Sequence, residues 1–310
     1  MILVTGSTGF VGRHLVRMLQ DRGLPCRPVS RDQRPDHVAI GAISQQTDWS
    51  GALSGVDCVI HLAARVHVMH ESATDPMSAF RQMNVEATLN LARQAARAGV
   101  RRFVFVSSVK VNGEMTEPGQ AFGPDDAPDP QDAYGISKAE AEAALRVLGR
   151  ETGLEIVVIR PPLVYGPGVG ANFRLLMRWA GSGVPSPFGA CDNRRSLVFV
   201  DNLAELLIVA ARHPQAAGET FLASDGEDLS TQALFSRLAR LQGRKGYGLP
   251  IPPVLMHRFA ALVGRQSHSQ RLLSNLQVDI AKNNALLGWT PPISVEAGLR
   301  RTVDGERLLG

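Results

Sequence analysis

Three glycines near the N-terminus constrain the fold of this chain more than any other feature. Gly6, Gly9 and Gly12 stand between a short apolar run and an amphipathic helical pattern. At this spacing glycines allow a tight turn, close approach of a pyrophosphate to the backbone and close packing of helix on strand. The free N–H groups at the start of the helix would face the phosphates. The turn therefore predicts a dinucleotide site made by Gly6, Ser7, Thr8, Gly9, Phe10, Val11 and Gly12.

Beyond this turn, short apolar runs alternate with helical patterns, which is typical of a parallel sheet. We expect strands over residues 2–4, 26–30, 38–43, 58–62, 103–107 and 155–160. An apolar stripe at helical spacing covers residues 74–99, and a second helix is expected over 133–151. Residues 114–131 contain four prolines and are expected to form a loop.

The predicted fold class is α/β, a Rossmann-type doubly wound parallel sheet with a smaller C-terminal substrate-binding lobe. The dinucleotide-binding domain is expected to span residues 1–163, with residues 196–223 rejoining its sheet. Residues 164–195 and 224–310 are expected to form the substrate-binding lobe.

Composition limits the kinds of partner. The 310 residues carry a formal net charge of +4, and the lysines and arginines are spread along the chain. This suits a small anionic ligand and excludes a dedicated nucleic-acid binder. We find no secretion signal and no apolar run of about 18 residues, so we expect no membrane span and a cytoplasmic protein. Cys26, Cys58 and Cys191 lack metal-ligand spacing, which favours reduced thiols and no metal site.

Tyr134 and Lys138 are four residues apart in the second predicted helix, so their side chains would project from one face. A neighbouring ammonium favours phenolate, and we expect it to lower the pKa of Tyr134. Such a phenol can give a proton to a carbonyl oxygen or take one from a hydroxyl. Ser108 follows a strand at the carboxyl edge of the sheet, where its hydroxyl can hold the substrate oxygen.

Two polar residues near this cluster have competing interpretations. Asn84 is either a solvent-facing residue or a buried anchor that reaches the catalytic lysine through water. His61 is expected to be structural, whereas the small residues after it, Leu62, Ala63 and Ala64, would allow close approach of the cofactor.

The end of the second strand bears on the choice of cofactor. An acid there favours NAD, because it accepts hydrogen bonds from the ribose hydroxyls. Ser30 and Arg31 stand there instead, and they suit a 2′-phosphate, so we prefer NADP(H). Asp32 keeps NAD(H) open, and Arg31 can equally be a solvated loop charge.

Six motifs in this order resemble the extended short-chain dehydrogenase/reductase superfamily, specifically its nucleotide-sugar epimerase/dehydratase branch. The glycine turn at 5–12 resembles its Thr-Gly-x-x-Gly-x-x-Gly motif, and residues 61–64 resemble its His-Leu-Ala-Ala element. The other four matches are residues 84–88, 105–108, 160–168 and 287–291.

The resemblance implies roles. Ser108, Tyr134 and Lys138 would form the catalytic triad, with Asn84 in support, and Lys138 would also bind the nicotinamide ribose. Pro161 would pack near the nicotinamide. A UDP-sugar would be the substrate, and the helices around 75–98 and 133–151 would form a homodimer. Arg195, and through a looser match Arg271, would bind the substrate diphosphate.

The resemblance also ranks the reactions. Val109 and Lys110 follow Ser108 where dehydratases of this branch carry an acid pair, which disfavours dehydration. Residues 110–112 resemble sequences assigned to reduction of UDP-4-keto-6-deoxy-N-acetylhexosamines, which makes Lys110 a candidate substrate contact. We therefore prefer C4-keto reduction. The alternative is a UDP-hexose or N-acetylhexosamine 4-epimerase with tightly bound NAD. A non-catalytic sensor or interaction protein is disfavoured by the intact triad.

Overall fold

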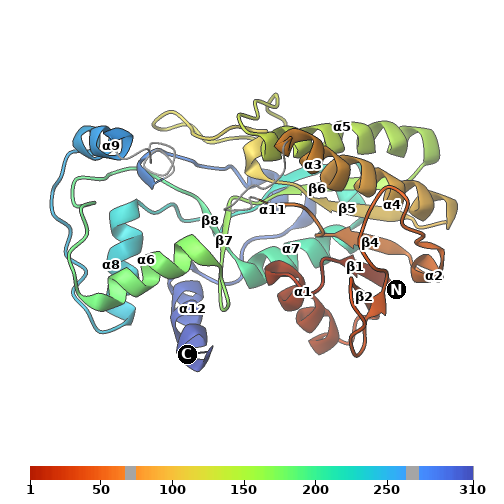
Figure 1. The fold of residues 1–310 in the computed structure, drawn as a ribbon, viewed down its shortest axis with the longest axis horizontal. Coiled ribbons are helices and arrows are strands. Elements are labelled where there is room, and N and C mark those ends of the chain that lie inside the picture. Colours follow the sequence, from red (N-terminus) through yellow and green to blue (C-terminus); the bar gives the residue numbers. More distant parts are fainter. Residues whose placement is uncertain (67–74, 263–271, 310) are drawn as a thin grey trace.

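A seven-stranded parallel sheet forms the larger part of the molecule (Figure 1). The computed structural model describes residues 1–66, 75–262 and 272–309. In sheet order the strands are β3 (Val38–Ala39), β2 (Cys26–Ser30), β1 (Ile2–Thr5), β4 (Cys58–His61), β5 (Arg102–Val106), β6 (Glu155–Arg160) and β9 (Thr220–Leu222). The predicted fold class is confirmed.

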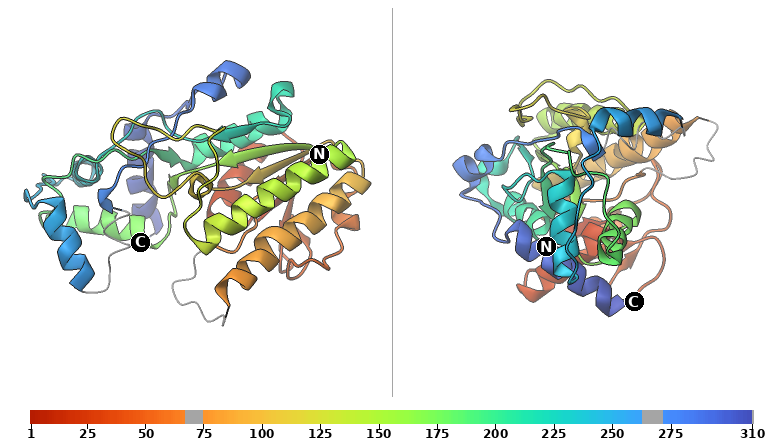
Figure 2. Two further views of the ribbon diagram at one scale, coloured as in Figure 1. Left: turned by 90° about the horizontal axis from the view of Figure 1, so that it is seen from above. Right: turned by 90° about the vertical axis from the view of Figure 1, so that its left-hand side faces the viewer.

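Helices cover both faces of this sheet, and each face has its own apolar core (Figures 1 and 2). On one face lie α1 (Phe10–Asp21) and α7 (Val200–Arg212), which pack against each other. The other face carries α2 (Ser50–Leu53), α3 (Pro76–Arg81), η1 (Gln82–Glu86), α4 (Ala87–Arg97) and α5 (Ala133–Thr152). Strands buried on both faces explain why the sequence runs there are continuously apolar.

The chain order reverses beside β1, which pairs with β2 on one side and β4 on the other. In open α/β sheets, ligands bind outside the carboxyl ends of the strands at such a point. The loop after β1 holds the glycine turn, and the loops after β4, β5 and β6 end at the same edge.

The smaller lobe contains a separate parallel pair, β7 (Leu163–Tyr165) and β8 (Leu197–Phe199). Around it lie α6 (Ala171–Ser182), α8 (Thr231–Leu241), α9 (Pro253–Leu262) and α12 (Val295–Leu309), with α11 (Ala281–Leu287) nearer the main sheet (Figure 1). The expectation that residues 196–223 rejoin the main sheet is wrong for β8 and correct for β9, which pairs with β6. After Pro161 and Pro162 the chain leaves the sheet edge, and β7 becomes the partner of β8.

Other predictions hold with adjusted bounds. The strand predicted over 38–43 ends at Ala39, because Gly41 takes a positive φ of 70°. The first long helix is divided by η1, a π-helical turn of the kind often found at functional sites. Residues 114–131 are irregular, as expected, and Phe122 pairs with Val278.

Among the described residues, no helix is long and apolar enough to cross a membrane.

Candidate active site

A cavity of about 660 Å³ opens at the carboxyl edge of the sheet. It runs from the glycine turn to the start of α5, so it joins the predicted dinucleotide and catalytic residues. The predicted residues that line it are Gly6, Thr8, Gly9, Phe10, Val11, Gly12, Ser30, Arg31, Leu62, Ala63, Ala64, Ser108, Tyr134, Lys138 and Pro161. Ser7, Asn84, Lys110 and Arg195 do not line it, and Arg271 lies outside the described residues.

The glycine turn leaves no room for side chains at two of its positions. Gly6 has a φ of 66°, and a Cβ there would lie 2.8 Å from the backbone nitrogen of Ala63. A Cβ on Gly12 would lie 2.1 Å from the carbonyl oxygen of Gly6. Gly9 is the N-cap of α1 and has no side chain to occupy the free N–H groups of the first turn. This bare backbone cradle beside a helix N-terminus fits a dinucleotide pyrophosphate.

Ser7 is the member of the turn that faces away from the cavity. Its hydroxyl donates to the carbonyl oxygen of Val29 at 2.6 Å, and the residue is buried. Ser7 therefore ties the turn to β2, and its side chain is not placed to contact a ligand.

Tyr134 and Lys138 both face the cavity from the first turns of α5. Asp132 caps this helix by accepting from the N–H of Gly135 at 2.8 Å, which fixes where the helix begins. Nζ of Lys138 donates to the carbonyl oxygen of Val106 at 2.8 Å. It also lies 5.9 Å from the centre of the Tyr134 ring.

The expected fall in the pKa of Tyr134 is wrong for the protein chain by itself. Burial raises the pKa of Tyr134 to about 12, and the nearby carboxylate of Asp132 adds to the rise. Burial lowers the pKa of Lys138 to about 7, against the opposing effect of Glu142. The chain thus holds a protonated phenol beside a lysine that changes charge near neutral pH.

Ser108 and Asn84 flank this pair in different ways. Ser108 lines the cavity and caps the short helix η2 (Val109–Val111). Asn84 is fully buried in η1, which excludes the solvent-facing interpretation. Its Nδ2 donates to Ser137 Oγ at 2.9 Å, and its Oδ1 accepts from the backbone of Arg65 at 2.8 Å. Asn84 therefore joins the segment after β4, at Arg65, to Ser137 of α5.

His61 is structural, as expected. Its two ring nitrogens are hydrogen-bonded to the hydroxyls of Thr5 at 2.7 Å and Thr88 at 3.0 Å. Burial lowers the pKa of His61 to about 3, and the charge of Lys138 contributes. The neutral ring therefore joins β1 and β4 to α4 beneath the cavity.

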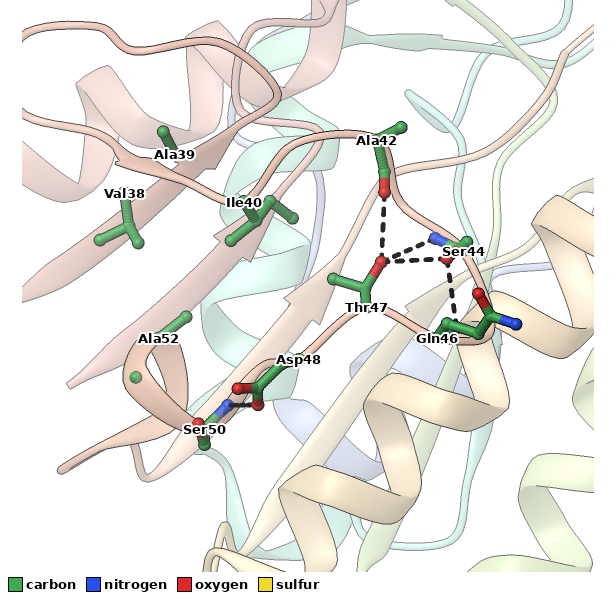
Figure 3. Close-up of a pocket in the computed structure, with 11 residues that line it drawn as sticks. Val38, Ala39, Ile40, Ala42, Ser44, Gln46, Thr47, Asp48, Ser50 and Ala52 are labelled. Carbon is green, nitrogen blue, oxygen red and sulfur yellow. Dashed lines mark hydrogen bonds between the residues drawn. The ribbon is translucent and has the colours of Figure 1, made fainter.

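The far end of the cavity contains residues that sequence patterns did not single out. Ile40, Ala42 and Ile43 line it beside Ser30 and Arg31. Ile40 and Ala42 also border a second cavity of about 690 Å³, which extends to Thr47, Asp48 and Ala52 (Figure 3). The sequence signal for this turn was Gly41 itself, since glycine readily takes the positive φ that ends the predicted strand.

Arg31 is exposed and lines the cavity, whereas Ser30 is occupied within its own loop. The Ser30 hydroxyl donates to the carbonyl oxygen of Asp32 at 2.6 Å. Arg31 is therefore the group at this position that is placed to meet a phosphate.

Lys110 and Arg195 are engaged elsewhere. Nζ of Lys110 forms ion pairs with Glu114 at 2.7 Å and with Asp132. Nη1 of Arg195 donates to the carbonyl oxygen of Ser274 at 3.0 Å. In this arrangement neither side chain reaches the cavity.

No group of metal-binding side chains occurs within residues 1–66, 75–262 and 272–309. Cys26, Cys58 and Cys191 are free thiols.

Comparison with known proteins agrees with this geometry. Residues 2–223 match the NAD dependent epimerase/dehydratase family. A UDP-glucose 4-epimerase of Vibrio cholerae is 42% identical over 97% of this chain and 94% of its own length. Two solved structures have the same fold: UDP-glucose 4-epimerase of Thermotoga maritima with UDP-glucose (TM-score 0.78, 23% identity, 99% of both chains) and RMD of Pseudomonas aeruginosa with NADPH (TM-score 0.76, 23% identity, 98% of both chains). The chain therefore belongs to the NAD dependent epimerase/dehydratase family, among the extended short-chain dehydrogenases/reductases.

Proposed function

We propose that this enzyme is a UDP-sugar 4-epimerase that retains NAD and interconverts the two configurations at C4. The observation that carries the proposal is the 42% identity to a UDP-glucose 4-epimerase along nearly the whole chain. The cavity supports it, because Ser108, Tyr134 and Lys138 face one space that begins at the glycine turn. This reverses the order of our sequence expectations, in which C4-keto reduction came first.

In the proposed mechanism, Tyr134 moves the proton at O4 of the sugar. Bound NAD supplies the acceptor and donor of the C4 hydride. The protonated phenol suits donation to a C4 ketone, and oxidation of the alcohol requires its phenolate. The ammonium of Lys138 favours that phenolate, and a cationic nicotinamide ring would act in the same direction. The hydroxyl of Ser108 holds the same oxygen.

The binding roles follow the cavity from end to end. We assign the pyrophosphate to the turn at residues 6–12, the nicotinamide to the surface at Pro161, and its ribose to Lys138. Residues 1–163 would serve as the dinucleotide domain, and 164–195 with 224–310 as the sugar-nucleotide lobe. In that lobe, Arg195 and Arg271 remain our candidates for the diphosphate. Lys110 would reach substrate only after giving up its partners Glu114 and Asp132.

A second function, C4-keto reduction with NADPH, is favoured by one observation. Arg31, exposed at the end of β2, lines the cavity where the adenosine ribose would lie. A guanidinium there would pair with a 2′-phosphate. If this is correct, Arg31→Ala weakens NADPH binding about tenfold or more and leaves NAD binding unchanged.

The two functions differ in the nucleotide that the purified enzyme carries. An epimerase regenerates its cofactor in each cycle, so we expect mass spectrometry of the denatured protein to release NAD. If no nucleotide is recovered and a 4-keto sugar oxidises NADPH stoichiometrically, the proposed function would be C4-keto reduction and not epimerisation.

A further inference from the structure

Glu142 is a buried carboxylate on α5, one helical turn beyond Lys138. It does not line the cavity, so it has no direct contact with the proposed ligands. Its side chain is only 1% exposed, and a buried charge is costly unless its hydrogen bonds are satisfied.

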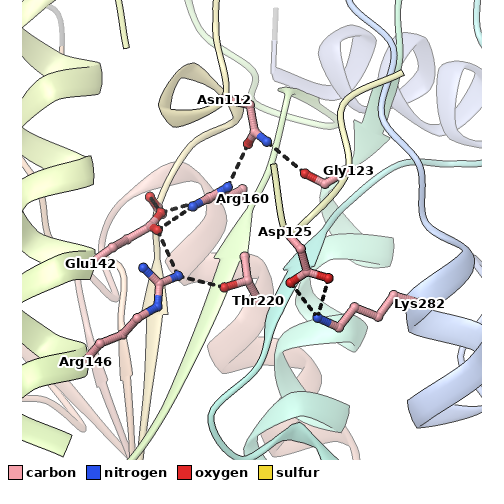
Figure 4. Close-up of polar contacts among 9 residues, drawn as sticks. Asn112, Gly123, Asp125, Glu142, Arg146, Arg160, Thr220 and Lys282 are labelled. Carbon is pink, nitrogen blue, oxygen red and sulfur yellow. Dashed lines mark hydrogen bonds and ion pairs between the residues drawn. The ribbon is translucent and has the colours of Figure 1, made fainter. Parts of the chain in front are cut away.

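The carboxylate is satisfied on both oxygens (Figure 4). Oε1 accepts from Ser107 Oγ at 2.6 Å and from Arg160 Nε at 2.9 Å. Oε2 accepts from Arg160 Nη2 at 2.7 Å and from Arg146 Nη2 at 3.2 Å. Glu142 therefore accepts hydrogen bonds from the ends of two strands and from its own helix.

The two strand ends continue directly into the cavity. Ser107 follows β5 and precedes Ser108, and Arg160 ends β6 and precedes Pro161. Ser108 and Pro161 both line the cavity, and their strand ends are joined by the N–H of Val109, which donates to Pro161 O at 3.0 Å. A shift of the carboxylate would displace both residues.

The same arginine connects this centre to the proline-rich loop. Nη1 of Arg160 donates to Asn112 Oδ1 at 3.0 Å, and Nδ2 of Asn112 donates to the carbonyl oxygen of Gly123 at 2.9 Å (Figure 4). The loop meets the smaller lobe one residue earlier, where Phe122 pairs with Val278.

We propose that Glu142 is a positioning residue for catalysis, whose carboxylate braces the ends of β5 and β6 and supplies the negative charge behind Lys138. The inference rests on the proposed function, in which the ammonium of Lys138 acts on Tyr134.

The surroundings of Lys138 explain why this charge matters. From α5 it is faced by Tyr134 and Glu142, from β4 by neutral His61, and from β5 by the ring of Phe105 at 4.5 Å. Arg160 and Arg146 are hydrogen-bonded to Glu142. Burial lowers the pKa of Lys138 to about 7, and Glu142 opposes that fall. Without Glu142 the ammonium would be lost at lower pH.

The chain offers a direct test, because it has only four lysines, Lys110, Lys138, Lys245 and Lys282. Each ε-carbon can be followed by NMR in protein labelled with ¹³C-lysine, and the Lys138 signal is assigned by its loss in Lys138→Met. We expect Glu142→Gln to move the Lys138 titration about 1 pH unit lower. An unchanged titration would overturn the proposal, and this readout does not depend on any substrate.

Glu140→Gln is the matched control, since Glu140 lies on the same helix but pairs with Arg81 at the surface. It should leave the Lys138 titration unchanged. If Glu142→Gln does not fold, the double variant Glu142→Gln/Arg160→Gln removes both buried charges. It should move the Lys138 titration in the same direction but less far, because loss of the positive Arg160 opposes the effect of losing Glu142. In assays with UDP-glucose, kcat of wild type should fall at alkaline pH as Lys138 loses its proton. In Glu142→Gln this fall should begin at lower pH, with little change in KM. A uniform loss of kcat at every pH would indicate a merely structural role and contradict the proposal. Inactive wild-type protein would contradict only the proposed function.

Discussion

Tyr134 and Lys138 show which properties of single residues can be predicted from sequence and which cannot. Their spacing of four predicted a shared helix face, and both side chains do face the same cavity. The direction of the Tyr134 pKa shift was predicted wrongly, because the burial that raises this pKa is set by segments distant in the sequence. Asn84 is similar: its hydrogen bonds to Ser137 and Arg65 depend on how η1 packs against α5.

Removing the phenol oxygen gives the first prediction. Tyr134→Phe keeps the ring and its contact with Phe80, so dinucleotide binding should persist. Proton transfer at O4 would be lost, and kcat should fall roughly 10²–10⁴-fold in an epimerase assay. Tyr247→Phe, at an exposed tyrosine of the smaller lobe, is the control and should match wild type. Equal turnover by Tyr134→Phe would remove Tyr134 from the mechanism.

His61 makes the stability of the fold depend on pH. The unfolded chain binds a proton at this ring near pH 6.5, whereas the folded chain binds it only near pH 3. The stabilisation is therefore complete above pH 6.5 and is lost as the pH falls towards 3, by up to about 1.4 kcal/mol per pH unit.

The check is thermal or urea unfolding between pH 7 and pH 4. The free energy of unfolding of His61→Asn should fall less over this range than that of wild type. At pH 7 the variant should be less stable than wild type, because the hydrogen bonds to Thr5 and Thr88 are altered. His37→Asn, in the loop before β3, should follow the wild-type slope. Parallel curves for wild type and His61→Asn would show that His61 does not contribute.

At the scale of elements, local patterns predicted most of the main sheet. Residue type and the glycines that precede them, Gly23 and Gly153, placed β2 and β6 correctly to the residue. Pairing of β8 could not be predicted this way, because its partner depends on where the chain travels after Pro162. The loop at 40–43 was assigned to a strand because apolar side chains are typical both of a buried strand and of a loop that lines a cavity. In the structure the apolar residues of this loop line the ligand cavity.

The glycine turn gives the prediction at this scale. Gly12→Ala would place a Cβ 2.1 Å from the Gly6 carbonyl oxygen, so the helix and turn must separate. We expect a loss of about 1–3 kcal/mol in stability and about tenfold or more in dinucleotide affinity. Gly170→Ala is the control, because a Cβ there meets nothing within 4 Å. If Gly12→Ala bound NAD as tightly as this control, the cradle would not hold the pyrophosphate.

For the whole molecule, we propose a homodimer formed through α4 and α5, which lie side by side on one face of the sheet (Figure 2). Val147 is 44% exposed on α5 and would be covered in such a dimer. Sedimentation should give twice the monomer mass, and Val147→Asp should shift the protein towards monomer. Val184→Asp, at an exposed valine of the other lobe, should remain dimeric. A monomeric wild type would contradict this assembly.

The family resemblance read from the sequence is confirmed along nearly the whole chain. For the reaction, the comparisons favour 4-epimerisation, which the sequence analysis placed second, over C4-keto reduction. Reductase and epimerase share the same triad, so no local motif separates them. They differ in whether the cofactor returns to its starting state within one cycle.

The central claim is therefore tested most directly by proton NMR of UDP-glucose incubated with the purified enzyme and no added nicotinamide. Our account predicts that the anomeric signal of the C4 epimer, UDP-galactose, grows to a constant ratio while the absorbance of reduced nicotinamide shows no net change. UDP-N-acetylglucosamine should be tested in parallel as the second candidate substrate. The account would be contradicted if neither sugar changed its configuration at C4 and the enzyme instead reduced a UDP-4-keto sugar with oxidation of NADPH.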